Sequence, residues 1–298
     1  MIPSQIRKAV EWACILEATA QKPGNVHPRA SFADLDYPDF VRAAIACSEP
    51  LSNAGELGVG RAVYEAVRET QGVARSNVNL GIALLLAPMC KAVAGWPDFM
   101  PTLMELRTTV EVELRLLDFI DSEYAYRAIR LANPGGLGTA KEQDVSKPPT
   151  MNLREAMELA ADRDAIARQY TNAFDDVFDV GLSAVESSIE AGLGWEDAAL
   201  HCHLAFMAAI PDSLIARKLG TELAEESQRR AQAVLDKDCD AAAVRELDDW
   251  LRADGNKRNP GTSADLTAAA LFAASVTGVF PKRPQLPKGP PKKKRRDR

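Results

Sequence analysis

The chain has 298 residues, 46% of them hydrophobic, so it can bury a sizeable core and is not disordered throughout. Its 36 basic and 42 acidic residues give a net charge of −6. Without residues 281–298, the remaining 27 basic and 41 acidic residues give −14. A body this acidic argues against nucleic acid as a general partner, although metal ions or a local basic pocket can still bind a polyphosphate.

The sequence also bears on location. No run of about 18 apolar residues occurs, and the longest, 80–89, contains Pro88. The N-terminal residues lack the basic start and apolar stretch of a signal peptide. We therefore expect a cytoplasmic protein that spans no membrane. The cysteines form no C-x-x-C pair, and we expect all of them to be reduced, small, buried residues: Cys14, Cys47, Cys90, Cys202 and Cys239.

Apolar residues recur three and four positions apart along nearly the whole chain, which predicts an all-α protein. The first helix carries the stripe from Ile6 to Ala20 and stops at Pro23-Gly24. The second begins near Pro38 and buries Ala44 and Ile45, and the third runs from Val59 to an end at Gly72. Residues 79–94 are apolar almost all round, so this helix is expected at the centre of the bundle.

Further helices are expected at about 102–117, 121–132 (with Asp121 as N-cap), 152–191, 195–209, 212–219, 221–236, 241–253 and 263–279. The stretch from Asn133 to Pro149 is long for a connection, and is either a lid or binding loop or a plain flexible connector. With no repeat and no linker before Pro281, we predict one multi-helix bundle domain, 1–280. A disordered tail, 281–298, rich in Pro, Lys and Arg, follows. Its basic run also resembles a nuclear-localisation or nucleic-acid contact segment.

Four segments place polar side chains beside apolar helices. In the first, Glu17 is followed by Lys22-Pro23-Gly24-Asn25-Val26-His27 and then by Asp34 and Asp36. A lysine beside a glycine turn suits phosphate oxygens, and the two aspartates suit a hard cation. The alternative is a helix end followed by a polar loop.

The second segment, Asn77-Val78-Asn79-Leu80-Gly81, precedes the apolar helix, where amides can cap the helix and free N–H groups can receive an anion. In the third, Asp212 and Arg217 lie five apart, about 140° around an ideal helix. If both face a cleft, the acid binds metal and the arginine binds phosphate. An N-cap and a solvated charge are the alternative.

The fourth segment is Asn259-Pro260-Gly261-Thr262-Ser263-Ala264-Asp265, before an apolar helix. Thr262 or Ser263 can cap that helix, and Asp265 suits the helix dipole.

Two other groups of polar residues are expected to have structural rather than catalytic roles. His201 and His203 do not share a helix face, so we expect partly buried histidines rather than metal ligands. Residues 162–176 are expected to form a solvated, ion-paired face, with Asp164 or Arg168 turned to the site as the alternative.

Together and in this order, the four segments resemble the triphosphoribosyl-dephospho-coenzyme A synthase family over about residues 10–277. That family has an acid one turn before K-P-G-[LN]-V, then N-T-x-x-G, D-T or D-S with an arginine and a glycine, and N-P-G-[GST]-[ST]-A-D-L. The resemblance implies a helical transferase with ATP and dephospho-coenzyme A as partners. Adenine leaves C1 of the ATP ribose, and the 2′-hydroxyl of dephospho-coenzyme A takes its place. The product is the prosthetic-group precursor of citrate lyase or malonate decarboxylase acyl carriers.

On this resemblance we assign residues to catalysis and binding. The catalytic carboxylates are expected among Glu17, Asp34, Asp36, Asp212 and Asp265, since a carboxylate can stabilise an oxocarbenium-like ribose or act as base. Mg²⁺ is expected on Glu17, Asp212 and Asp265. Lys22 and Arg217 are expected on phosphates, and the other substrate-binding residues are Asn25, His27, Asn77, Asn79 and Ser263. Spacing does not tell which carboxylate is the base.

The chain departs from the citrate-lyase-type pattern at two motifs. Asn77 to Gly81 lacks the threonine and histidine of N-T-H-x-G, and Ala216 to Gly220 lacks the histidine and paired glycines of D-T-x-x-x-H-R-G-G. Donor chemistry is thus better supported than the acceptor. Two alternatives stay open: a related transferase with another acceptor, for example in pterin-linked one-carbon metabolism, and a non-catalytic nucleotide-binding protein. The oligomeric state is open too, with a homodimer as the candidate.

Overall fold

The computed structural model describes residues 1–74, 78–96 and 100–280. These residues form fifteen α-helices and one π-helix, and the described chain contains no strand beyond two isolated bridges in the loop after the first helix. The all-α prediction is therefore confirmed. The disordered tail predicted at 281–298 lies outside the described residues, and the limits of the predicted domain remain predictions.

The N-terminal helices are α1 (Pro3–Thr19), α2 (Tyr37–Ser52), α3 (Ala54–Leu57) and α4 (Val59–Gln71). They confirm the first three helices expected from the sequence. The stripe of α1 is buried from Ile6 to Leu16, against α2 and α15. Ile45, expected in the core, is 50% exposed, because Ala44, Cys47 and Leu51 form the buried row of α2.

Helix α5 (Leu80–Val93) confirms the prediction of a central helix, because all its residues except Lys91 are buried. Helices α6 (Leu103–Arg115) and α7 (Phe119–Ala132) follow. The N-cap of α7 is Asp118, whose Oδ1 accepts from the N–H groups of Ile120 and Asp121, so the prediction of Asp121 as cap was wrong. Asp121 lies three residues further on, and its buried carboxylate accepts the Gly60 N–H at 2.7 Å.

The prediction of a single helix over 152–191 is wrong. The chain instead forms α8 (Leu153–Glu158), α9 (Ala165–Thr171), the π-helix η1 (Asp176–Leu182) and α10 (Ser183–Glu190). Asp164 starts α9 as an N-cap, and Ala173 and Phe174 adopt φ of 56° and 65°, which no α-helix allows. The apolar periodicity continues across these breaks and therefore does not reveal them.

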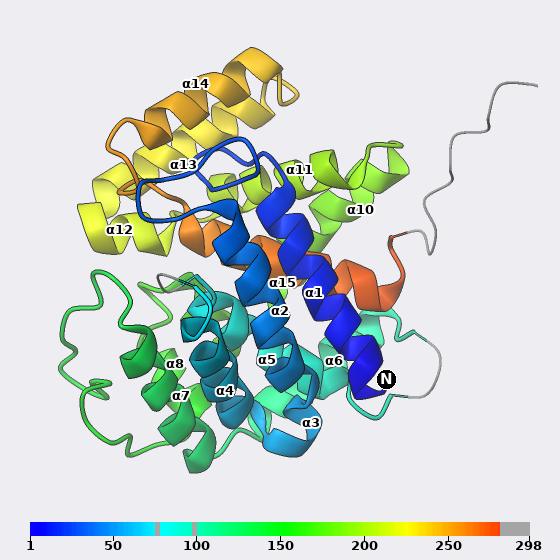
Figure 1. Ribbon diagram of the computed structural model, residues 1–298, viewed down its shortest axis with the longest axis vertical. Coiled ribbons are helices and arrows are strands. Elements are labelled where there is room, and N and C mark those ends of the chain that lie inside the picture. Colours follow the sequence, from blue (N-terminus) through cyan, green and yellow to red (C-terminus); the bar gives the residue numbers. More distant parts are fainter. Residues whose placement is uncertain (75–77, 97–99, 281–298) are drawn as a thin grey trace, which may run out of the picture.

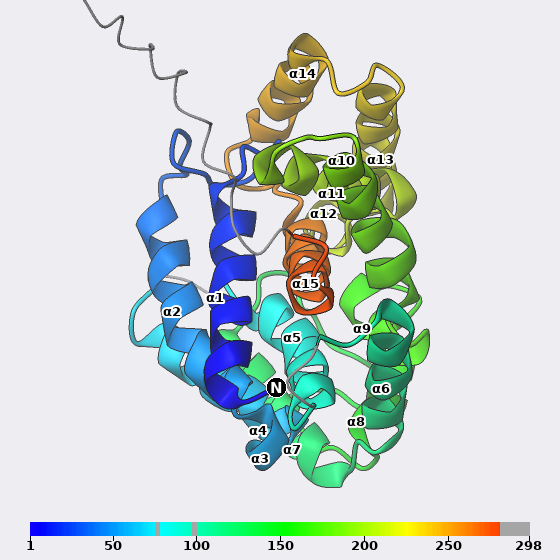
Figure 2. The same ribbon diagram turned by 90° about the vertical axis from the view of Figure 1, so that its right-hand side faces the viewer.

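The remaining helices match their predictions: α11 (Trp195–Ala209), α12 (Ser213–Leu219), α13 (Thr221–Leu235), α14 (Ala241–Arg252) and α15 (Gly261–Thr277). Figure 1 shows α12, α13 and α14 at one end of the molecule, with α3 to α8 at the other. Helix α15 runs through the middle, beside α1 and α5 (Figure 2).

Two hydrophobic clusters hold this arrangement together. The larger gathers around α1, α5 and α15, and the smaller lies among α11, α12, α13 and α14. Helix α11 joins them, because Cys202 and Phe206 belong to the larger cluster and Leu204 and Met207 to the smaller. The starts of α12 and α15 are thereby held between the two clusters.

No single helix in the described ranges is both long and apolar enough to cross a bilayer. Helices α11 and α12, which meet at an angle of 53°, would together be long and apolar enough, by length and composition alone. The cysteine prediction holds for four side chains, which are buried, whereas Cys239 is partly exposed.

Candidate active site

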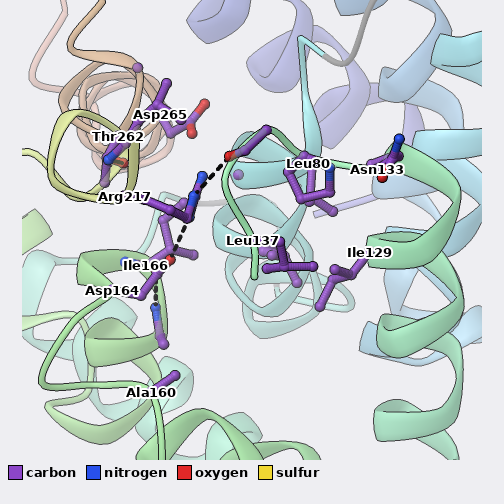
Figure 3. Close-up of a pocket in the computed structure, with 18 of the residues that line it drawn as sticks. Leu80, Ile129, Asn133, Leu137, Ala160, Asp164, Ile166, Arg217, Thr262 and Asp265 are labelled. Atoms are coloured by element: carbon purple, nitrogen blue, oxygen red, sulfur yellow. Dashed lines mark hydrogen bonds and ion pairs between the residues drawn. The ribbon is translucent and has the colours of Figure 1, made fainter. Parts of the chain in front are cut away.

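A pocket of about 910 Å³ opens between α12 and the start of α15 on one side and α5, α7, α8 and α9 on the other. Its wall comes from the loop after α1, the start of α5, α7, α8, α9, α12, the start of α15 and residues 133–145 (Figure 3). The volume is typical of a small-molecule site. The long stretch after α7 thus lines a pocket, as the binding-loop alternative expects.

The first motif forms a buried ion pair at the end of α1. The Nζ atom of Lys22 lies 2.9 Å from Oε1 of Glu17 and also donates to the Glu17 backbone carbonyl. The Pro23-Gly24 turn directs Lys22 backwards, and Gly24 has φ of +73° with Leu251 and Pro260 in close contact, which excludes a side chain there. Glu17 lines the pocket, whereas Lys22 is fully buried behind it. The phosphate contact expected of Lys22 stays a prediction.

The first and fourth motifs meet through two amides. Asn25 donates from Nδ2 to Oδ1 of Asn259 at 2.8 Å, and both residues line the pocket. The Asn25 backbone carbonyl accepts from Arg252 of α14. The Oδ1 atom of Asn25 is buried and has no hydrogen-bond partner in the described part of the chain.

The third motif meets the fourth through Asp212, which caps α12. Its Oδ1 accepts the N–H groups of Leu214 (2.9 Å) and Ile215 (3.1 Å), and its Oδ2 accepts the N–H (2.8 Å) and hydroxyl (2.9 Å) of Ser263. These four donors occupy the acceptor positions of a carboxylate. Burial raises the pKa of Asp212, and the donors oppose that shift. Neither Asp212 nor Ser263 lines the pocket, so the geometry is that of the helix-cap alternative.

Asp265, the fifth residue of α15, has the opposite environment. It lines the pocket and makes no hydrogen bond or ion pair with any residue that the structure describes. Burial raises the pKa of Asp265 well above its usual range, and the nearby carboxylates of Glu17, Asp212 and Asp164 raise it further. A Cβ atom on Gly81 would overlap the Asp265 Oδ2 atom. The glycine of the second motif therefore makes room for the aspartate of the fourth.

Arg217 connects α12 to the far wall of the pocket. Its Nη1 lies 3.2 Å from Oδ2 of Asp164, and its Nε donates to the carbonyl of Gly135 at 3.1 Å (Figure 3). Asp164 thus faces the site, which was the alternative for residues 162–176. Arg168 turns away and pairs with Asp176 at 2.6 Å.

Sequence reasoning missed two cations of the pocket wall, Lys218 and Arg163. Burial and the neighbouring Arg217 lower the pKa of Lys218. The adjacent Arg217-Lys218 pair was the available signal for Lys218, although basic residues in the last turn of a helix also suit its dipole. Asp34 also lines the pocket, as an exposed residue whose charge acts on Lys218.

Several predicted site residues lie outside the pocket wall. Asp36 caps α2 by accepting the Asp39 N–H at 3.2 Å, and His27 accepts the Arg29 N–H at 3.3 Å, with its pKa lowered chiefly by burial. Asn79 donates to Sγ of Cys47 at 3.3 Å and does not cap α5. Asn77 lies outside the described residues.

His203, expected to be partly buried, is fully buried, and its pKa is lowered to about 3 by burial and by Lys22. It is therefore neutral and packs behind the first motif.

A family model for ATP:dephospho-CoA triphosphoribosyl transferases matches residues 3–283. The chain belongs to this family. Two bacterial proteins described as probable 2-(5''-triphosphoribosyl)-3'-dephosphocoenzyme-A synthases match over 118 residues: one from Pseudomonas savastanoi pv. phaseolicola at 36% identity and one from Pseudomonas syringae pv. tomato at 34%. Each match covers 38% of this chain and 39% of the relative, so it spans about two fifths of the relatives' length.

The fold is also similar to a crystal structure described as a triphosphoribosyl-dephospho-coA synthase from Archaeoglobus fulgidus. The TM-score is 0.62 and the identity 26%, over 80% of this chain and 99% of that chain. Membership of the triphosphoribosyl transferase family confirms the resemblance drawn from the four motifs. The structure adds that all four motifs supply residues to the pocket wall: Glu17, Gly81, Arg217 and Asp265.

The metal expected for this transferase family was placed on Glu17, Asp212 and Asp265. Within the described residues, no group of three His, Cys, Asp or Glu side chains is arranged to hold a metal ion. Mg²⁺, however, usually binds one or two carboxylates together with substrate phosphates. The carboxylates of Asp34 and Asp164 lie near the cations Lys218 and Arg217. A metal site in this pocket therefore stays a prediction.

Proposed function

We propose that the chain transfers the 5-triphosphoribosyl group of ATP to the 2′-hydroxyl of 3′-dephospho-CoA and releases adenine, as a step in the synthesis of an acyl-carrier prosthetic group. Family membership supports the reaction class. The observation that carries the proposal is Asp265, a carboxylate without a protein partner in the described chain, set in a pocket beside Glu17 and Asp164.

The carboxylates suit the two demands of this reaction. Cleavage of the bond from C1 to adenine builds positive charge on the ribose, which a carboxylate can stabilise. We assign this role to Glu17, which the ion pair with Lys22 holds in place. The acceptor hydroxyl must lose its proton as its oxygen bonds to C1, and a base works best with a pKa near neutral. We assign the role of this base to Asp265, whose pKa is raised and which would accept the hydroxyl proton.

The cations suit the triphosphate. Arg217, Lys218 and Arg163 line the same pocket, and an arginine can make forked contacts to phosphate. Arg217 would then exchange its bond to Asp164 for phosphate oxygens. Mg²⁺ would be held by phosphate oxygens with Asp34 and Asp164, and it would neutralise the charge of the triphosphate. This proposal moves the metal away from Asp212, whose acceptor positions are taken.

One part of the pocket wall is apolar and suits the acceptor. It is lined by Ile129, Leu137, Met157, Ala160 and Ile166, several of which Figure 3 shows facing one another. The pantetheine arm of dephospho-CoA would lie along these side chains. Val78, which stands where N-T-H-x-G has its threonine, also lines the pocket, as does Leu80. A related transferase whose acceptor has another extended apolar part is therefore the second candidate.

Adenine release from ATP tests the proposal. The full chain is incubated with ATP, Mg²⁺ and dephospho-CoA, and adenine is separated by chromatography. We expect release that needs both Mg²⁺ and dephospho-CoA. Release only with another acceptor would support the second candidate. If Mg²⁺ and ATP raise the melting temperature by mass action, reversibly with EDTA, but no acceptor gives adenine, the chain is a non-catalytic nucleotide binder. No thermal shift at millimolar ATP would contradict the nucleotide site itself.

The cytoplasmic location and the absence of a nucleic-acid role remain predictions from the sequence. The acidic body supports the second of these.

A further inference from the structure

A glycine-rich strap, residues 134–138 with the sequence Pro-Gly-Gly-Leu-Gly, follows α7 and forms part of the pocket wall. The stretch after the strap is tied back to α7, because Tyr126 donates to the Gln143 carbonyl at 2.9 Å and Arg130 donates to the Val145 carbonyl. Among the described residues, the strap itself makes no such hydrogen bond to α7. Its position therefore depends on what it meets on the other side of the pocket.

The strap is held on that other side by Arg217 of α12. The Nε atom of Arg217 donates to the Gly135 carbonyl at 3.1 Å, and its Nη1 atom lies 3.2 Å from Oδ2 of Asp164 (Figure 3). A Cβ atom on Gly136 would lie 3.0 Å from Cγ and 3.1 Å from the carbonyl oxygen of Arg217. The strap is thus packed against Arg217 as well as hydrogen-bonded to it.

A phosphate bound to Arg217 would disturb both of its present contacts. The guanidinium is planar and rigid, so it cannot turn its fork towards phosphate oxygens and keep both partners. Asp164 cannot follow the movement, because its Oδ1 accepts the N–H groups of Ile166 (2.9 Å) and Ala167 (3.1 Å) at the start of α9. A triphosphate that binds Arg217 would therefore release the Gly135 carbonyl and, with it, the strap.

The strap also covers the apolar part of the pocket wall. Leu137 of the strap lies beside Ile129 of α7 in this part (Figure 3), and Leu137 is 42% exposed. Under the proposed function, the extended arm of the acceptor lies along these same side chains. When the strap moves away, Leu137 leaves Ile129 and uncovers this part of the wall.

We propose that the strap is a gate, which Arg217 keeps closed in the absence of nucleotide and which a polyphosphate bound at Arg217 opens for the acceptor. This inference rests on the proposed function, from which it takes the triphosphate site at Arg217. It adds an order of binding, in which the nucleotide enters before the acceptor. The strap has room to move, because a Cβ atom on Gly138 would meet no atom within 4 Å.

Limited proteolysis of the full chain with chymotrypsin tests the gate. Cleavage after Leu137 needs a detached strap, and its rate follows the population of the open form. We expect magnesium tripolyphosphate, used as the probe, to speed this cleavage. Arg217→Gln should speed it about tenfold or more without any ligand, because a hydrogen bond from a charged group is lost. Mass spectrometry identifies the cleaved bond, and circular dichroism checks that the variant remains folded.

Two alanine variants separate the contact with Arg217 from backbone strain. Gly136 and Gly138 both have positive φ, +75° and +64°, so alanine strains the strap at either position. Only at Gly136 would the added methyl group press on Arg217. Gly136→Ala should therefore speed the cleavage without ligand, as Arg217→Gln does. Gly138→Ala, the matched control, should stay closer to the parent and still respond to tripolyphosphate.

Calorimetry tests the order of binding. Dephospho-CoA should bind about tenfold or more tightly in the presence of magnesium tripolyphosphate than alone, because the probe removes the cost of opening the strap. In Arg217→Gln the probe should give little further gain, since the strap is already released. Equal affinity of the parent chain with and without the probe would contradict the gate.

The outcomes distinguish the gate from the proposed function. A parent chain whose melting temperature rises with tripolyphosphate, but whose cleavage after Leu137 does not change, would overturn the gate. So would an Arg217→Gln variant that is cleaved at the rate of the parent. Adenine release with an unresponsive strap would leave only the transfer reaction standing. Faster cleavage with tripolyphosphate, in a chain that releases no adenine with any acceptor, would support the gate and contradict the transfer.

Discussion

At the scale of residues, two aspartates with similar sequence contexts have opposite environments. Both precede or open a helix and both lie in a family motif. Asp212 accepts four hydrogen bonds from Leu214, Ile215 and Ser263, whereas Asp265 accepts none from the described protein and faces the pocket. The donors that surround a carboxylate, rather than its motif, decide whether it holds the fold or meets a substrate.

Asp265→Asn should abolish adenine release and stabilise the fold at neutral pH. The raised pKa means that the folded state keeps a proton that the unfolded chain, with a pKa of about 3.9, has already lost. The parent therefore loses stability as pH rises from that value towards the raised pKa, and the asparagine variant does not. Urea unfolding at pH 4.5 and pH 8 should show an advantage of the variant that grows with pH. A variant less stable than the parent at pH 8 would contradict this account.

Gly81→Ala tests the close contact between the second and fourth motifs. The added methyl group would overlap Oδ2 of Asp265, so the side chain or the start of α5 must shift. We expect a loss of about 1–3 kcal/mol in the free energy of unfolding and a large loss of turnover. Gly72→Ala is the control, because its Cβ meets only the Glu69 carbonyl at 3.4 Å and its φ is −67°. An active, fully stable Gly81→Ala variant would show that the contact is not needed.

At the scale of elements, short polar contacts join segments that are distant in sequence. Asn25 binds Asn259 across 234 positions, and Asp212 binds Ser263 across 51. Each contact fixes the start of α15, and α15 carries Asp265. The motifs of the family are thus partly structural, because they place one helix terminus against the pocket.

Asp212→Asn should destabilise the protein, in contrast to Asp265→Asn. An amide NH₂ group cannot accept from the Ser263 N–H and hydroxyl, so one side of the α12 cap or the contact to α15 is lost. A buried donor left without a partner costs about 1–3 kcal/mol. We expect a lower melting temperature together with reduced adenine release. If Asp212→Asn instead melts higher than the parent and is inactive, Asp212 is the substrate-facing or metal-binding acid predicted from the sequence.

At the scale of the whole molecule, the two hydrophobic clusters lie within residues 1–280 and share α11. The pocket lies where their helices meet. The family match ends at residue 283, so it covers almost none of the basic segment that follows.

Deleting residues 281–298 should leave the melting temperature and any turnover nearly unchanged. The segment carries nine basic residues, one acidic residue and five prolines, a composition that buries little apolar surface. Scanning calorimetry and the adenine assay on the shortened chain measure both quantities. A drop of several degrees would mean that the segment docks on the body.

The sequence by itself determined most helices, the central position of α5 and the family, because helix periodicity and motif order are local properties of the chain. It did not reveal the breaks at Asp164 and Ala173, because the apolar pattern continues through them. Only the tertiary structure showed that Asp212 is a cap, that Lys22 is buried against Glu17, and that Asp164 and Lys218 line the pocket. The physical reason is that a polar side chain's role depends on which donors and charges surround it. Some of these come from segments 50 to more than 200 positions away, as Ser263 does for Asp212 and Asn259 for Asn25.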